Sequence, residues 1–157
     1  GLSKFTAMKI SLFDVSGSQI RHATLKKFDE RSTGSKCYNS RTGVGIGGGN
    51  KDGYSIRVAT ADLLARREAK KVLVVLSDGL PSDYNGGPRA GLNDVREAVR
   101  EARRKGVIVI PIMFGRASDR EQMKDNFSYM YGQFISCDPI DITDEFTKLF
   151  TKLIQTA

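Results

Sequence analysis

Two apolar runs decide the fold of this chain, KKVLVVLSDG at Lys70–Gly79 and VIVIPIM at Val107–Met113. Each is dominated by β-branched residues and leucine, which is typical of a strand buried on both faces. Between them, Asn93–Lys105 places its apolar residues on one helical face, ends in cations and is followed by Gly106, a common helix stop. Strand, helix and strand in this order predict a βαβ unit, whose right-handed crossover makes the two strands parallel.

The segments around this unit extend the same pattern. Asp52–Arg67 has Ile56 and Leu63 on one face and is predicted to be a helix that packs on the sheet, with Asp52 placed to cap it. A short strand at Phe134–Cys137 and a C-terminal amphipathic helix follow, and FSYMYGQF from Phe127 is predicted to be an amphipathic connector. The fold class is therefore α/β, a three-layer sandwich with a mostly parallel sheet.

Asp29–Lys51 is rich in glycine and polar residues and is predicted to be a long loop. Its GVGIGGGN run suggests a phosphate-binding loop at first sight. No Gly-Lys-Ser/Thr follows and no strong strand precedes it, so the sequence does not support that assignment.

The N-terminal segment has two interpretations. In the first, Met8–Phe13 is a strand that ends in DVSGS (Asp14–Ser18), a literal DxSxS, and a helix follows. In the second, Ala7–Asp14 and Gln19–Phe28 form a hairpin, with Gly17 taking the positive φ that a tight turn needs. The spacing of apolar residues is compatible with both, so periodicity leaves the choice open.

Length and charge narrow the function classes. The 157 residues suit one domain, and 25 Lys and Arg against 18 Asp and Glu give a formal net charge of +7. The cations are dispersed, and the arginines of Asn93–Lys105 alternate with acids, which favours solvated helix surface over a nucleic-acid patch. No apolar run is long enough to cross a bilayer, so we expect no membrane span.

The number and spacing of the cysteines and histidine argue against a disulfide framework and against zinc or multi-histidine sites. Cys37 and Cys137 form neither a disulfide framework nor a CxxC zinc motif, and His22 is the only histidine, which excludes a multi-histidine metal site within these residues. The first residues, GLSKFTAMKI, lack the features of a secretory signal. We therefore expect a cytoplasmic protein, of which these residues are the C-terminal part.

The run Asn50–Tyr84, NKDGYSIRVATADLLARREAKKVLVVLSDGLPSDY, carries a resemblance. It resembles the second half of a von Willebrand factor A (vWA) domain, in the bacterial subset that includes nitric oxide reductase activation proteins and cobalt-chelatase subunits. An Asp-Gly opening a helix, a strand closing on Ser-Asp-Gly and a proline-containing loop occur together there, and the similarity continues to about Gly115. The resemblance implies a Rossmann-like sheet between helices, one antiparallel edge hairpin, and a single vWA-like domain over residues 1–157.

The resemblance also favours the hairpin interpretation of the N-terminal segment. In the family a DxSxS strand is followed by a helix and then by a hairpin, and LKKFDE (Leu25–Glu30) resembles the end of that hairpin. The DVSGS match is then a coincidence, and the first family strand with its metal motif would lie upstream. If DVSGS is instead the genuine motif, Asp14, Ser16 and Ser18 are metal ligands.

The family places a metal-ion-dependent adhesion site (MIDAS) at the carboxyl ends of the strands. The resemblance implies that Asp78 is a ligand and that Asp52 stands where other members use threonine; Asp83 and Tyr84 would lie in the surrounding shell or touch a partner. Magnesium prefers six oxygen ligands, so such a site suits Mg²⁺. Each residue also has a simpler interpretation, because Asp78–Gly79 can be an ordinary turn and Asp52 a helix cap.

The expected function is that of a protein-binding module rather than an enzyme. Relatives in the bacterial subset work with a MoxR-type AAA+ ATPase, so the resemblance implies an adaptor or activation subunit in metal insertion or enzyme maturation, with the ATPase and a target enzyme as partners. A magnesium-dependent phosphoryl hydrolase using Asp78 and Asp83 is an alternative, although no base or phosphate clamp is identifiable. A basic nucleic-acid-binding domain is the other.

Overall fold

The computed structural model describes residues 7–30 and 48–155, and the chain divides into two compact units, Gly1–Lys51 and Asp52–Ala157. Most of the predicted glycine-rich loop, together with Cys37, lies outside the described residues. No helix among the described residues is both long and apolar enough to cross a bilayer.

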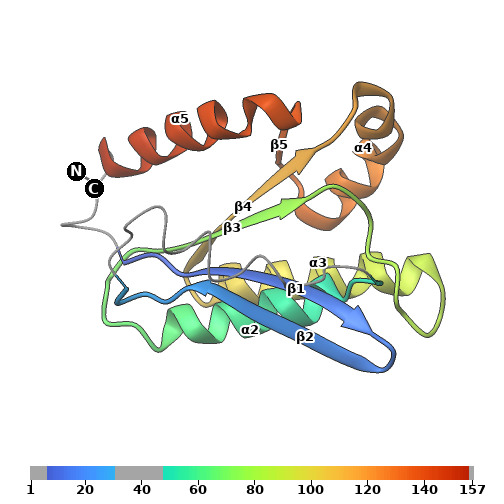
Figure 1. The fold of residues 1–157 in the computed structure, drawn as a ribbon, viewed down its shortest axis with the longest axis horizontal. Coiled ribbons are helices and arrows are strands. Elements are labelled where there is room, and N and C mark those ends of the chain that lie inside the picture. Colours follow the sequence, from blue (N-terminus) through green and yellow to red (C-terminus); the bar gives the residue numbers. More distant parts are fainter. Residues whose placement is uncertain (1–6, 31–47, 156–157) are drawn as a thin grey trace. The chain divides into compact units, whose positions relative to one another are not determined.

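The first unit contains the hairpin. Strands β1 (Ile10–Ser16) and β2 (Gln19–Lys26) pair antiparallel, with Ser16 opposite Gln19, and Gly17 has a φ of 60° in the turn between them. A positive φ at this position suits glycine, which has no Cβ to clash. The hairpin interpretation is confirmed, and the alternative of a helix after DVSGS is wrong, because the residues after Ser18 continue as a strand (Figure 1).

The second unit holds a parallel sheet. Strand β3 (Lys71–Ser77) pairs in parallel with β4 (Val107–Phe114), which pairs in parallel with the short strand β5 (Ile135–Cys137). The sheet order is β3-β4-β5, so β4 is central. The βαβ prediction and the short third strand are therefore confirmed.

Four helices belong to this unit: α2 (Asp52–Leu64), α3 (Pro88–Arg104), α4 (Ala117–Tyr131) and α5 (Ile142–Gln155), the last preceded by a short 3-10 turn, η2 (Pro139–Asp141). Figure 1 shows α2 and α3 on one side of the β3-β4 sheet and α5 on the other. This is the three-layer α/β arrangement that the sequence predicts. Helix α3 begins five residues earlier than predicted, at Pro88, because proline is well tolerated in the first turn of a helix.

Helix α4 corrects one prediction. The supposed connector from Phe127 is the last turn of this helix, and Phe127, Met130 and Tyr131 are all buried. They join the apolar stripe of α3 and the covered face of the sheet in one core, which includes Val95, Val99, Val107 and Met113. Fully burying one such apolar side chain contributes about 1.5–3 kcal/mol, so this layer holds the second unit together.

Candidate functional site

The start of α2 and the end of β3 lie at the same end of the second unit. Helix α2 precedes β3 and runs antiparallel to it, so the first residue of the helix lies near the carboxyl end of the strand (Figure 1). Asp52 is that first residue, and Asp78 follows β3 directly. The structure thus places the two predicted ligands at one end of the sheet, where binding sites of open α/β folds are commonly found.

The two aspartates have different surroundings. Asp52 is only 1% exposed, and its place in the first turn of α2 suits a negative charge, because the helix dipole is positive there. Asp78 is exposed to solvent. The turn around it is closed by Ser77, whose hydroxyl donates to the Gly79 carbonyl oxygen at 3.0 Å and accepts from the Gly79 amide at 3.4 Å. Both backbone polar groups of Gly79 thus find a partner within the turn.

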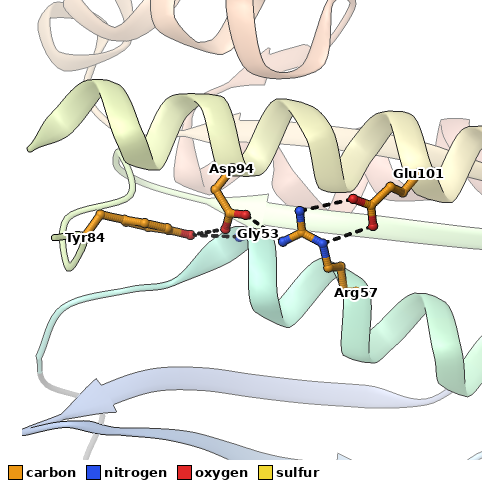
Figure 2. Close-up of polar contacts among 5 residues, drawn as sticks. All are labelled: Gly53, Arg57, Tyr84, Asp94 and Glu101. Carbon is orange, nitrogen blue, oxygen red and sulfur yellow. Dashed lines mark hydrogen bonds and ion pairs between the residues drawn. The ribbon is translucent and has the colours of Figure 1, made fainter. Parts of the chain in front are cut away.

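Tyr84 connects the loop after β3 to the start of α2 (Figure 2). Its hydroxyl donates to Asp94 Oδ2 at 2.8 Å and accepts from the Gly53 amide at 3.3 Å. Burial, and then the hydrogen bond to Asp94, raise the pKa of the Tyr84 hydroxyl well above its usual value, so it stays a neutral donor. Tyr84 therefore holds the loop that carries Asp78 and Asp83 against the first turn of α2.

Arg57 joins α2 to α3 beside this contact (Figure 2). It donates from Nη1 to Asp94 Oδ1 at 2.7 Å, and from Nε and Nη2 to the two oxygens of Glu101 at 3.0 and 3.3 Å. The hydrogen bond from Arg57 lowers the pKa of the Glu101 carboxyl. Asp94 of α3 thus accepts hydrogen bonds from both Tyr84, in the loop after β3, and Arg57, in α2. It is the residue that links these three segments.

The network of Arg57, Tyr84, Asp94 and Glu101 was missed by sequence reasoning, apart from Tyr84. Asp94 and Glu101 are seven residues apart and so share one side of α3, and Arg57 is the only cation within α2. That pattern was the available signal. The interpretation of the charges of Asn93–Lys105 as plain solvated surface is therefore wrong for Asp94 and Glu101.

The other predicted residues lie as follows. Asp83 is half-buried in the loop after β3. Ser16 ends β1, Ser18 lies in the hairpin turn, and Asp14 sits opposite Arg21, which donates from Nε to Asp14 Oδ1 at 2.8 Å. The strand-then-helix setting in which these three residues would be ligands is absent from the described hairpin. Asp14 instead forms a cross-strand ion pair.

The donor chemistry at the β3 end fits a hard cation. Mg²⁺ binds oxygen and is commonly held through one or two carboxylates while water completes its octahedron. Asp52 and Asp78 offer such oxygens. Within residues 7–30 and 48–155, no group of three or more His, Cys, Asp or Glu side chains is arranged to hold a metal, so an ion at this end would need oxygen ligands from water or from a partner besides the two aspartates.

Two Tyr→Phe variants measure how much the hydrogen bonds of Tyr84 contribute to the stability of the second unit. Tyr84→Phe is expected to destabilise the second unit by about 1–2 kcal/mol, because the Gly53 amide and Asp94 Oδ2 each lose a partner. Tyr131→Phe is the matched control: its hydroxyl is buried and has no hydrogen-bond partner among the described residues, so its removal is expected to be neutral or stabilising. Urea denaturation measures both, and equal losses in the two variants would contradict the assignment.

Comparison with known proteins identifies the family. The model of the von Willebrand factor type A domain matches residues 38–129. The chain is 41% identical over 85 residues to the protein YojO of Bacillus subtilis (strain 168), which covers 54% of this chain and 13% of YojO. It is 38% identical over 102 residues to Protein NorD of Brucella suis biovar 1, which covers 63% of this chain and 16% of NorD.

Protein PA0525 of Pseudomonas aeruginosa is 32% identical over 117 residues, which is 73% of this chain and 18% of that protein. The matched region is thus less than a fifth of the length of each of these relatives. Because the family model covers more than half of the chain, and the sheet and helices agree with it, the chain belongs to the von Willebrand factor type A domain family.

Proposed function

We propose that this vWA domain is a protein-binding module whose binding site is the carboxyl end of β3, where Asp52 and Asp78 hold a magnesium ion. The observation that carries the proposal is the placement of these two aspartates at one end of the sheet, on segments that Tyr84 links. When bound, the ion supplies positive charge that makes a carboxylate of the partner a specific ligand.

The residues of the chain have separate tasks in this proposal. Asp78 is exposed and supplies oxygen on the side open to solvent, while Asp52 supplies a buried negative charge at the start of α2. An aspartate at position 52 adds charge, so it favours retention of the cation and weakens attraction for an incoming carboxylate. Asp83 and Tyr84 lie in the loop that follows Asp78. Tyr84 fixes this loop to α3 through its hydrogen bond to Asp94.

The partners proposed are a MoxR-type AAA+ ATPase and a target enzyme, with the domain acting as an adaptor or activation subunit in metal insertion or enzyme maturation in the cytoplasm. The similarity to proteins named NorD supports the role of an activation subunit. We propose no catalytic role for the domain itself. Arg57, a cation beside the start of α2, is engaged by Asp94 and Glu101, which makes it a poor clamp for a phosphate substrate.

Magnesium titration tests the proposal directly. A ligand present at tenfold its Kd stabilises the folded state by about 1.4 kcal/mol, so the melting temperature of the wild-type domain is expected to rise as Mg²⁺ is added. Asp78→Ala is expected to abolish the rise, because it removes a ligand oxygen. Asp125→Ala removes an exposed carboxylate from α4 and is the matched control, which should keep the full shift.

Binding of the ATPase is measured in the same series. Titration calorimetry with a purified MoxR-type ATPase is expected to show association in Mg²⁺ that EDTA and Asp78→Ala both remove. Association that survives both treatments would refute the metal-dependent site. A wild-type domain whose melting temperature ignores Mg²⁺ would refute it as well.

A further inference from the structure

The charged residues of α3 are sorted onto two sides of the helix. Asp94 and Glu101 lie on the side that receives Arg57 from α2. A second side carries a row of four arginines at intervals of seven, four and three residues that follow the helical repeat: Arg89, Arg96, Arg100 and Arg103. Glu97 lies beside this row and pairs with Arg100. The apolar residues between them face the core. Because Asp94 and Glu101 are turned toward α2 and Glu97 pairs with Arg100, no acid of α3 pairs with Arg89 or Arg96 in the described part of the chain.

A tyrosine from α4 organises the first half of this arginine side. The guanidinium carbon of Arg96 lies 4.5 Å, and that of Arg89 5.4 Å, from the centre of the Tyr129 ring. The Tyr129 hydroxyl donates to Asn93 Oδ1 at 2.6 Å, which fixes the ring against α3. Two cations two helical turns apart are thus gathered at one aromatic ring, and cation–π attraction holds both in place.

Two of these arginines differ from Arg100 in their charged surroundings. Neither Arg89 nor Arg96 forms an ion pair within the described part of the chain, whereas Arg100 pairs with Glu97 at 2.8 Å. The first turn of α3 contains no acidic residue, and Arg89 stands there at the positive end of the helix dipole, where a cation is unfavourable. The Tyr129 ring holds both guanidinium groups but carries no negative charge, so an anion from outside the chain would supply the charge that the two arginines lack.

We propose that Arg89, Arg96 and Tyr129 form a docking site for an acidic segment of a partner protein, extended along α3 by Arg100 and Arg103. Two guanidinium groups held in place can each take a carboxylate in a bidentate geometry, and arginine suits such pairs better than lysine. The site rests on the proposed function only in that the partner is a protein. It lies on a helix face and not at the strand ends, so it needs no metal.

The same surface favours a peptide over a nucleic acid. Glu97 lies on α3 beside the arginines, and its side chain is 49% exposed. A phosphate backbone that followed the arginines would pass this carboxylate, whose negative charge opposes the electrostatic attraction that supplies most of the affinity for nucleic acids. A peptide can place single acidic side chains at Arg89 and Arg96 and avoid Glu97.

Fluorescence polarisation with a fluorescein-labelled, glutamate-rich decapeptide tests the proposal on the whole chain in EDTA. The peptide is expected to bind the wild type, and Arg89→Gln with Arg96→Gln is expected to weaken binding about tenfold or more. The matched control, Arg116→Gln with Lys148→Gln, removes the same charge from exposed residues of other elements and should change binding less than about twofold. Tyr129→Ala should weaken binding, while Tyr129→Phe, which keeps the ring, should weaken it less.

Three results would overturn the docking site: no binding of the peptide by the wild type, equal weakening by the control pair, or tighter binding of a single-stranded DNA of equal charge that the Arg89 and Arg96 substitutions remove. Asp78→Ala is included as a separate arm and should bind the peptide as the wild type does. Failure of the metal site therefore leaves this result unchanged, and the two proposals fail independently.

Discussion

Gly53→Ala is expected to destabilise the second unit by about 2–3 kcal/mol, because the site has no room for a methyl group. A Cβ at position 53 would lie 2.1 Å from Oδ2, 2.6 Å from Cγ and 3.0 Å from the backbone carbonyl carbon of Asp94. Asp94 cannot easily retreat, since Tyr84 and Arg57 bind its carboxylate at 2.8 and 2.7 Å. The substitution must therefore separate α2 from α3 or break this network.

The matched control for Gly53→Ala is Gly79→Ala. A Cβ at Gly79 meets nothing within 4 Å, and the φ angle of Gly79 is not in the positive region that disfavours alanine. The free energy of unfolding is therefore expected to change by less than about 0.5 kcal/mol. Urea denaturation followed by far-ultraviolet circular dichroism compares the two. Similar stabilities for the two variants would show that α2 and α3 do not approach as closely as described.

The βαβ core could be predicted from the sequence because its signals are local. Strand β3 and strand β4 are uninterrupted apolar runs, and α3 places Val95, Val99 and Ala102 at helical spacing and ends before Gly106. Each of these features lies within one segment, so no knowledge of distant contacts is needed. The parallel arrangement then follows from the handedness of the crossover.

The hairpin could not be settled from the residues of that segment. Its apolar positions suit a helix after DVSGS as well as a second strand, and a glycine in the turn fits both. The deciding interaction is the pairing of Asp14 with Arg21, and of Ser16 with Gln19, across two strands. Cross-strand contacts of this kind depend on register, which the sequence does not display.

The network at the start of α2 was missed for a related reason. Gly53, Arg57, Tyr84 and Asp94 come from a helix, a loop and another helix, and each is unremarkable within its own segment. Helix α4 was missed because its first turns are polar and its buried residues, Phe127, Met130 and Tyr131, all lie near its end. A helix that buries apolar side chains only in its last turn shows little helical periodicity of apolar residues in its sequence.

Phe127→Ala is expected to have the largest effect of the substitutions considered, a loss of about 3–5 kcal/mol. Its side chain is 0% exposed, and its ring centre lies 5.5 Å from that of Tyr131 and 5.6 Å from that of Phe134, in tilted arrangements that aromatic pairs favour. Removal of the ring leaves a cavity in the core of the second unit, beside Tyr131 and Phe134. A loss of this size is a large part of the stability of an ordinary domain.

The control for Phe127→Ala is Ile140→Ala, since Ile140 is 88% exposed and is expected to contribute almost nothing to stability. Thermal and urea denaturation should separate the two variants clearly, and comparable losses would contradict the described packing of α4. Phe127 also lies two residues from Tyr129, whose ring carries Arg89 and Arg96. Because the last turn of α4 both fills the core and presents Tyr129, Phe127→Ala is expected to weaken peptide binding in proportion to the folded fraction lost. Tyr129→Ala removes a ring that packs beside the core and its hydrogen bond to Asn93, and it is expected to weaken peptide binding by more than its loss of folded fraction accounts for.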